Sequence, residues 1–100
     1  MLSVDLKCDR TLKPNNSYLL SIMTTESFKV LQKFGLDGMS YKILIHDWSG
    51  NRYFVWHYDN IETDIGQEVL ITIDDYKDWK TISNPYNGKS SHITGVNQVN

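Results

Sequence analysis

The sequence predicts an all-β protein, a small antiparallel barrel of four to six strands with at most one helix. Apolar and polar side chains alternate over several short segments, which is the period of a half-buried strand. Clusters of Gly, Pro, Asn, Asp and Ser separate these segments, and no long helical segment is present to connect parallel strands. Because a chain of 100 residues with so many strand edges hides them best by closing its sheet, we expect a barrel.

The first third of the chain predicts two strands. Alternation indicates a short strand at residues 2–8, turn residues indicate a loop at 13–16, and an apolar run indicates a second strand at 18–24. The glycines of residues 35–38 then turn the chain into the next hairpin.

Residues 25–34 fit two structures, and the pattern does not choose between them. A strand with a bend or bulge would place Phe28, Val30 and Phe34 on one side. A short helix that starts at a threonine cap would instead bury Phe28, Leu31 and Phe34.

Residues 41–58 predict a hairpin that folds back at Ser49-Gly50, and its pairing decides which side chains face the solvent. We expect Trp48 to face Asn51 across the turn, because this register gathers apolar side chains on one side. The expected inner set is Tyr41, Ile43, Ile45, Phe54, Trp56 and Tyr58, with Asp47 and Arg52 paired at its rim. The expected outer set mixes cations, hydrogen-bonding groups and rings: Lys42, Leu44, His46, Trp48, Asn51, Tyr53, Val55 and His57.

A second register remains open. A left-handed bulge at Gly50 would shift the pairing by one residue and exchange the two faces of the second strand. Phe54 and Trp56 in water, with Tyr53 and His57 packed inside, would therefore end the argument for the strand-binding surface expected above.

The second half of the chain continues with short elements. Residues 59–66 predict a polar connection, 67–76 a strand, 84–88 a tight turn and 92–99 a last strand. One face of the strand at 67–76 is apolar, formed by Val69, Ile71 and Ile73.

Composition predicts one domain over residues 1–100, with a charge that differs between its two parts. The net charge is −2, with seven basic and five acidic side chains in residues 1–58 but three and seven in residues 59–100. The single cysteine, Cys8, cannot form an internal disulfide, and no apolar run has the length of a signal peptide core or a membrane span. We therefore expect a cytoplasmic protein without a membrane partner.

Three motifs, taken in order, resemble an OB-fold of the kind that binds single-stranded nucleic acid. They are Ile43-Leu-Ile-His-Asp47-Trp-Ser49-Gly50 followed by Phe54-Val-Trp56, then Ile65-Gly66-Gln-Glu-Val69-Leu-Ile71, and the loop from Tyr76 to Thr94 with Tyr86-Asn-Gly-Lys89. The resemblance covers residues 18–99 loosely. It implies a five-stranded antiparallel OB-like barrel over residues 17–99, preceded by an N-terminal strand and loop in residues 1–16.

The resemblance also implies a nucleic-acid-binding surface on the second and third strands and on a later loop. Base stacking on aromatic rings tolerates any sequence, and lysines offset phosphate charge. The implied binding residues are Lys42, His46, Trp48, Arg52, Tyr53, His57, Tyr76, Lys77, Trp79, Lys80, Tyr86 and Lys89.

Nothing in the sequence indicates catalysis, a metal or a cofactor, so we expect a protein that is not an enzyme. In the expected register His46 and His57 lie about 13 Å apart along the hairpin, too far to share one ion. The chain has no nucleophile elbow, phosphate-binding loop, dinucleotide fingerprint or zinc spacing.

Two functions from different classes fit these observations. The first is binding of single-stranded DNA or RNA with little sequence preference, in replication, recombination or repair, where pairing into a homodimer would add affinity. The second is a small acidic protein-interaction module, an inhibitor or accessory subunit of host or phage origin, whose exposed rings suit a basic protein partner.

Overall fold

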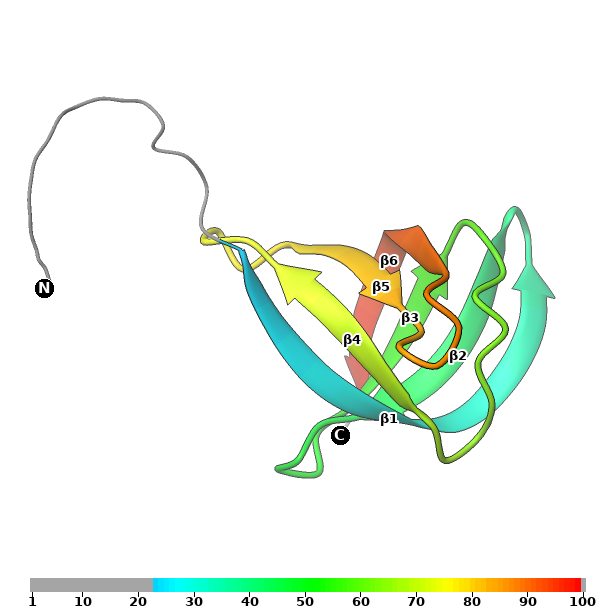
Figure 1. Cartoon of the computed structure of the whole chain (residues 1–100), viewed down its shortest axis with the longest axis horizontal. Coiled ribbons are helices and arrows are strands. Elements are labelled where there is room, and N and C mark those ends of the chain that lie inside the picture. The colour runs from blue at the N-terminus through cyan, green and yellow to red at the C-terminus, as the bar shows by residue number, and fades with distance from the viewer. Residues whose placement is uncertain (1–22, 100) are drawn as a thin grey trace, which may run out of the picture.

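The computed structural model describes residues 23–99, and these form a closed antiparallel barrel of six strands in the order β1-β2-β3-β6-β5-β4. The strands are β1 (Thr24–Asp37), β2 (Ser40–His46), β3 (Arg52–His57), β4 (Glu68–Ile73), β5 (Trp79–Ser83) and β6 (Ser90–Val99). The chain makes one three-stranded meander, crosses an end of the barrel and makes a second meander (Figure 1). The two meanders join where β1 pairs with β4 and β3 pairs with β6, so no strand edge is left open.

The all-β barrel expected from the sequence is confirmed, with six strands instead of five. The additional strand is β5, which lies inside the segment 76–94 expected to be a loop. Its Ile82 is fully buried. The expected strand at 2–8 and most of that at 18–24 lie outside the described residues.

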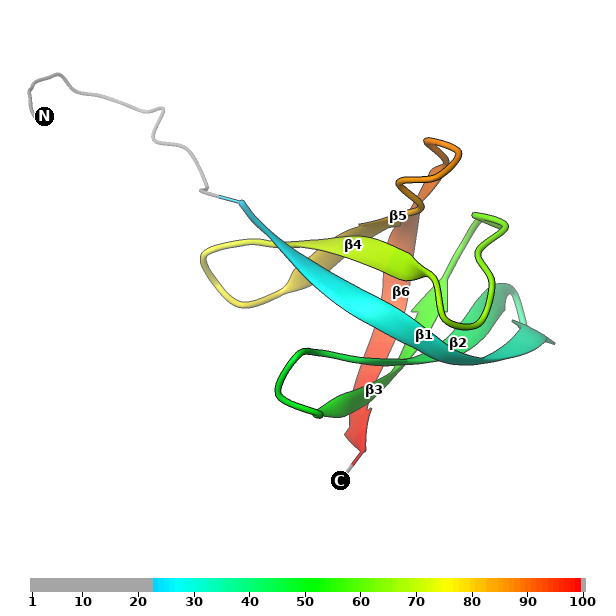
Figure 2. The ribbon, with the colours of Figure 1, turned by 60° about the horizontal axis from the view of Figure 1, so that its bottom comes forward.

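Residues 25–34, for which the sequence left a strand and a helix open, form part of a strand. β1 is 14 residues long and pairs with β4 through its first half and with β2 through its second half. Register shifts interrupt its pairing with β2 between Val30 and Gln32 and between Lys33 and Gly35. Because such bulges bend a strand, β1 can curve along the whole barrel, as Figure 2 shows. They also turn Phe34 to the surface, away from Phe28 and Val30.

The barrel interior holds one apolar cluster, whose fully enclosed side chains come from every strand except β6, and Ile93 of β6 packs against it while partly buried. Its buried members are Phe28, Val30, Ile43, Ile45, Val55, Ile61, Val69, Ile71, Ile73 and Ile82. The alternation expected for Val69, Ile71 and Ile73 is thus confirmed.

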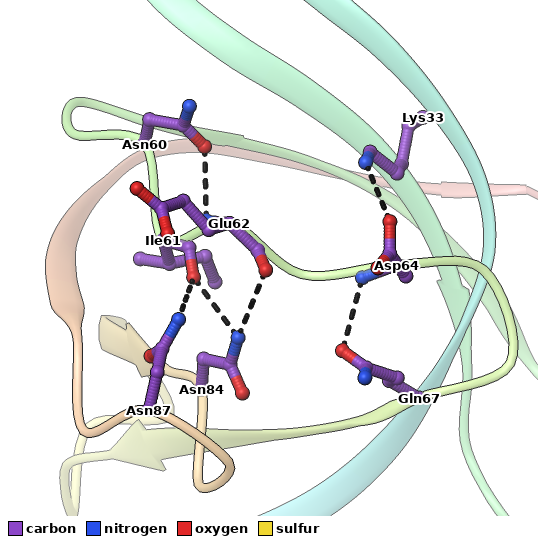
Figure 3. Close-up of polar contacts among 8 residues, drawn as sticks. All are labelled: Lys33, Asn60, Ile61, Glu62, Asp64, Gln67, Asn84 and Asn87. Carbon is purple, nitrogen blue, oxygen red and sulfur yellow. Dashed lines mark hydrogen bonds and ion pairs between the residues drawn. The ribbon is translucent and has the colours of Figure 1, made fainter.

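The connection over residues 58–67 closes one end of the barrel, and Ile61 is its plug, fully buried against the interior cluster. The amide of Asn84 donates to the carbonyl oxygens of Ile61 and Glu62, at 3.0 and 3.2 Å (Figure 3). Asn87 adds a bond to the Ile61 carbonyl at 3.2 Å. Ile61 and Glu62 lie outside the strands, so these side-chain amides from the β5–β6 turn supply the hydrogen bonds that the buried carbonyl groups of the connection need.

The opposite end of the barrel is built differently. The start of β1 and the β4–β5 turn lie together there, and the β2–β3 turn lies apart from them on the same side of the barrel, away from the plugged end (Figures 1 and 2). We call it the open end. Residues 23–99 contain no helix with the length and apolarity needed to cross a membrane.

Candidate nucleic-acid interface

The β2–β3 turn sets which side chains of the hairpin reach the surface. Asp47 and Asn51 pair through their backbones, and three residues lie between them, the last of which is Gly50 with φ +88°. The Asp47 carboxylate accepts hydrogen bonds from the backbone N–H groups of Ser49 and Asn51, each at 2.9 Å. This is a type I turn followed by a left-handed glycine, one of the common three-residue hairpin loops.

The register expected from the sequence is wrong by one residue, and the bulge at Gly50 is the reason. In the structure Ile43 pairs with Val55 and Ile45 with Tyr53. Because side chains alternate faces, a shift of one residue exchanges the two faces of β3. Tyr53, Val55 and His57 therefore turn inward, and Phe54 and Trp56 turn outward, so the strand-binding face expected from the sequence is wrong for β3.

The outward face that results still combines rings with a cation. The ammonium of Lys42 lies 4.4 Å from the ring centre of Phe54, 5.0 Å from that of Phe34 and 5.3 Å from that of Trp56. Phe54 lies 5.8 Å from Phe34 and 6.3 Å from Trp56, measured between ring centres. We call Phe34, Lys42, Phe54 and Trp56 the ring face. It lies on the outside of β1, β2 and β3.

Two contacts hold the indole of Trp56 in place. Its Nε1–H donates to the carboxylate of Asp37 at 2.8 Å. Its six-membered ring lies over Gly95 of β6, where an added methyl group would come within 3.4 Å of the ring. These two contacts, one with β1 and one with β6, set the position of the indole.

Further basic groups lie along the same outer surface, toward the open end. Arg52 begins β3 and is exposed, and it pairs across the strands with His46 of β2. His46 pairs on its other side with Lys29 of β1, also exposed. The outer surface of this meander therefore carries three basic side chains, Lys29, Lys42 and Arg52. The Asp37 carboxylate at its far edge is already bonded to Trp56.

The open end brings together three other residues of the expected site. Tyr53 and Trp79 contact each other, with ring centres 4.8 Å apart, and both pack on the buried Phe28. With Lys77 they line a pocket of about 430 Å³. Three carboxylates line the same pocket, those of Glu26, Asp74 and Asp75.

The remaining expected residues do not gather. Trp48 and Tyr76 are 74% and 79% exposed in the two turns of the open end. Tyr86 and Lys89 lie in the β5–β6 turn, at the plugged end. Two of the lysines already have carboxylate partners: Lys80 lies 3.7 Å from Asp74, and Lys89 lies 3.1 Å from Glu62.

His57 lies inside the barrel wall. It is 2% exposed, stacks on Tyr41 and shares a 2.7 Å hydrogen bond with the carbonyl of Asp59 through Nδ1. Burial lowers the pKa of His57, against the weaker opposing effect of Asp59. Within the described part of the chain its Nε2 has no hydrogen-bond partner, nor has the hydroxyl of buried Thr63. Both line a cavity of about 40 Å³, room for one water molecule.

Sequence reasoning missed three members of the ring face: Phe34, Phe54 and Trp56. The available signal was the Asp-x-Ser-Gly sequence at 47–50, whose aspartate caps the turn and whose glycine accepts the left-handed conformation. Phe34 gave no comparable signal, because two bulges in β1 decide its orientation.

Within residues 23–99 no three His, Cys, Asp or Glu side chains form a group that could hold a metal ion. Comparison with protein-family models, with curated proteins and with solved structures finds no match to this chain.

Proposed function

We propose that this protein binds single-stranded DNA or RNA with little sequence preference, and that the ring face is the contact surface. The observation that carries the proposal is the Lys42 ammonium among three rings on the outside of a rigid sheet. Rings that stack on bases contribute about 1–3 kcal/mol per base and accept any base. A cation among them attracts the phosphate that accompanies each base.

The charge distribution supports this surface over others on the molecule. Lys29, Lys42 and Arg52 share the outer surface of β1–β3, and no ion pair joins them to carboxylates within residues 23–99. Elsewhere carboxylates are in excess, since the described residues hold ten acidic against seven basic side chains. A polyanion is therefore steered to this side of the barrel.

The same surface agrees with the OB-like resemblance, which implies binding across the second and third strands of the described barrel. The proposal extends to a role in replication, recombination or repair. It keeps the cytoplasmic location expected from the single cysteine, and a homodimer as the form that gains affinity from two short sites.

Titration of a fluorescein-labelled oligothymidylate, followed by anisotropy at two salt concentrations, tests the proposal. We expect F54A to weaken binding by about 5- to 100-fold, since one stacking ring is lost. Y86A removes a ring that is 63% exposed at the plugged end, and we expect a change below about twofold. Replacing Lys42 with Gln should lower the salt slope by about 1. No binding at low salt, or equal affinity for F54A and wild type, contradicts the ring face.

A second candidate function is recognition of a basic protein. The observation that favours it is the pair of exposed rings, Trp48 and Tyr76, at an open end rich in carboxylates. Exposed aromatic side chains beside charge of one sign are typical of protein interfaces. Under this alternative W48A abolishes partner capture in a pull-down, and the oligonucleotide titration shows no binding.

A further inference from the structure

We propose that the pocket at the open end binds an organic cation, an ammonium or guanidinium group. This site is separate from the ring face. Tyr53 lines the pocket from inside the barrel, whereas its neighbour Phe54 belongs to the outer surface. The volume of about 430 Å³ falls within the range of pockets that hold small ligands.

The floor of the pocket is aromatic and well supported. Phe28 is 2% exposed, and the rings of Tyr53 and Trp79 pack on it at 5.8 and 5.0 Å between centres. The two upper rings remain partly exposed. A cation that rests on their faces gains attraction from the ring electrons, and most from an indole.

The rim of the pocket is negative. Glu26 and Asp75 are exposed carboxylates, from β1 and from the β4–β5 turn. Burial raises the pKa of the Tyr53 phenol, and the negative charges of Asp47 and Glu26 raise it further. The carboxylates thus disfavour a second negative charge in the pocket, which makes a phosphate a poor occupant and a cation a good one.

One cation of the chain, Lys77, lines the pocket, but no carboxylate within residues 23–99 forms an ion pair with it. Asp74 is engaged elsewhere: its carboxylate accepts the backbone N–H groups of Tyr76 and Asp78, each at 2.9 Å, and lies 3.7 Å from Lys80. No ion pair engages Glu26 or Asp75 within residues 23–99, so their charges remain for a ligand.

The test is an NMR titration of the ¹⁵N-labelled full chain with choline and with its neutral isostere 3,3-dimethylbutanol. We expect choline to shift the indole signal of Trp79, and the neutral compound to bind about tenfold more weakly. The indole signals of Trp48 and Trp56 serve as internal references outside the pocket. Equal binding of the two compounds, or shifts that spare Trp79, overturns the proposal.

Charge-removing variants locate the site without altering the barrel interior. E26Q and D75N should each weaken choline binding by about three- to tenfold. D64N removes an exposed carboxylate at the other end, paired with Lys33, and should leave the affinity unchanged. Unchanged affinity in E26Q and D75N also overturns the proposal. Both variants should keep wild-type oligonucleotide affinity, so failure here is distinguishable from failure of the ring face.

Short peptides identify the source of the cation. Tighter binding of a lysine-, trimethyllysine- or arginine-containing peptide than of choline assigns the pocket to a basic segment of a protein partner. Tighter binding of choline assigns it to a free small cation. Either result supports the pocket, and the absence of binding by all of these cations contradicts it.

Discussion

Replacement of Gly50 tests the turn on which the outer surface of β3 depends. Gly50 has φ +88°, and an added Cβ meets no atom within 4 Å. The whole cost of a side chain at this position is therefore conformational. A left-handed conformation costs an ordinary L-residue about 1–2 kcal/mol, whereas asparagine adopts it several-fold more readily than most side chains. We expect G50A to lower the free energy of unfolding by about 1.5 kcal/mol, and G50N by about half as much.

Urea unfolding, followed by tryptophan fluorescence, measures this difference. With a slope of about 1 kcal/mol per molar urea for a chain of this size, the midpoint for G50A should fall by about 1–2 M. The midpoint for G50N should lie between those of G50A and wild type. Because neither side chain meets a neighbour, the slope itself should not change.

Equal midpoints for G50A and wild type would show that Gly50 is not left-handed, and the register drawn from it would fail. A direct check is the set of cross-strand nuclear Overhauser effects in wild type. We expect them between the paired residues Ile43 and Val55. Contacts of Ile43 with Trp56 as its direct partner would restore the register first expected from the sequence.

Three further predictions concern stability. Burial lowers the pKa of His57 in the folded protein below the ordinary 6.5. Below pH 6.5 the unfolded chain therefore takes up a proton more readily than the folded chain. The free energy of unfolding should be highest above pH 6.5 and should fall by up to about 1.4 kcal/mol per pH unit until the pH reaches the pKa of the folded state. Urea melts at pH 7.5 and 5.5 measure this loss, and H57L should reduce it. N84A removes a buried amide that bonds the carbonyls of Ile61 and Glu62, so we expect a loss of about 3 kcal/mol in urea unfolding; a loss below about 1 kcal/mol would mean that the plug holds without this amide. K33A breaks an exposed ion pair with Asp64 and should cost less than about 1 kcal/mol in the same assay.

Local sequence patterns were a reliable guide to the class of the fold. Alternation in the segment with Val69, Ile71 and Ile73 predicted a strand with one apolar face, and all three side chains are buried. Turn chemistry predicted the loop that begins at Asn84. Hydrophobic alternation and turn residues each act over a few neighbouring residues. Both predictions hold because no tertiary contact overrides these local preferences.

The candidate site was less predictable, because both faces of β3 carry aromatic rings. Tyr53, Val55 and His57 alternate with Phe54 and Trp56, so a period of two describes either choice equally well. The interior of a small barrel has a fixed width, and β-branched Val55 fits among the interior isoleucines. The two larger rings of the other set lie outside, where Trp56 packs over Gly95.

Tertiary contacts also reversed what the polar connection at 59–66 indicated. A hydropathy pattern places such a segment on the surface, yet Ile61 is fully buried and Thr63 is 3% exposed. The reason lies in the amides of Asn84 and Asn87, more than 20 positions away, which bond the carbonyl of Ile61. A pattern among neighbouring residues cannot predict a hydrogen-bond partner so far away in the sequence.

The sequence by itself determined the all-β class, the hairpin at 41–58, the strand that holds Val69, Ile71 and Ile73, and the turn at 84–88, because each depends on neighbours along the chain. Only the tertiary structure decided which rings meet water, where the acidic pocket opens and which loop residue plugs the core. These depend on strand register, on two bulges in β1 and on the limited space inside the barrel, and all three are set by residues that lie far apart in sequence.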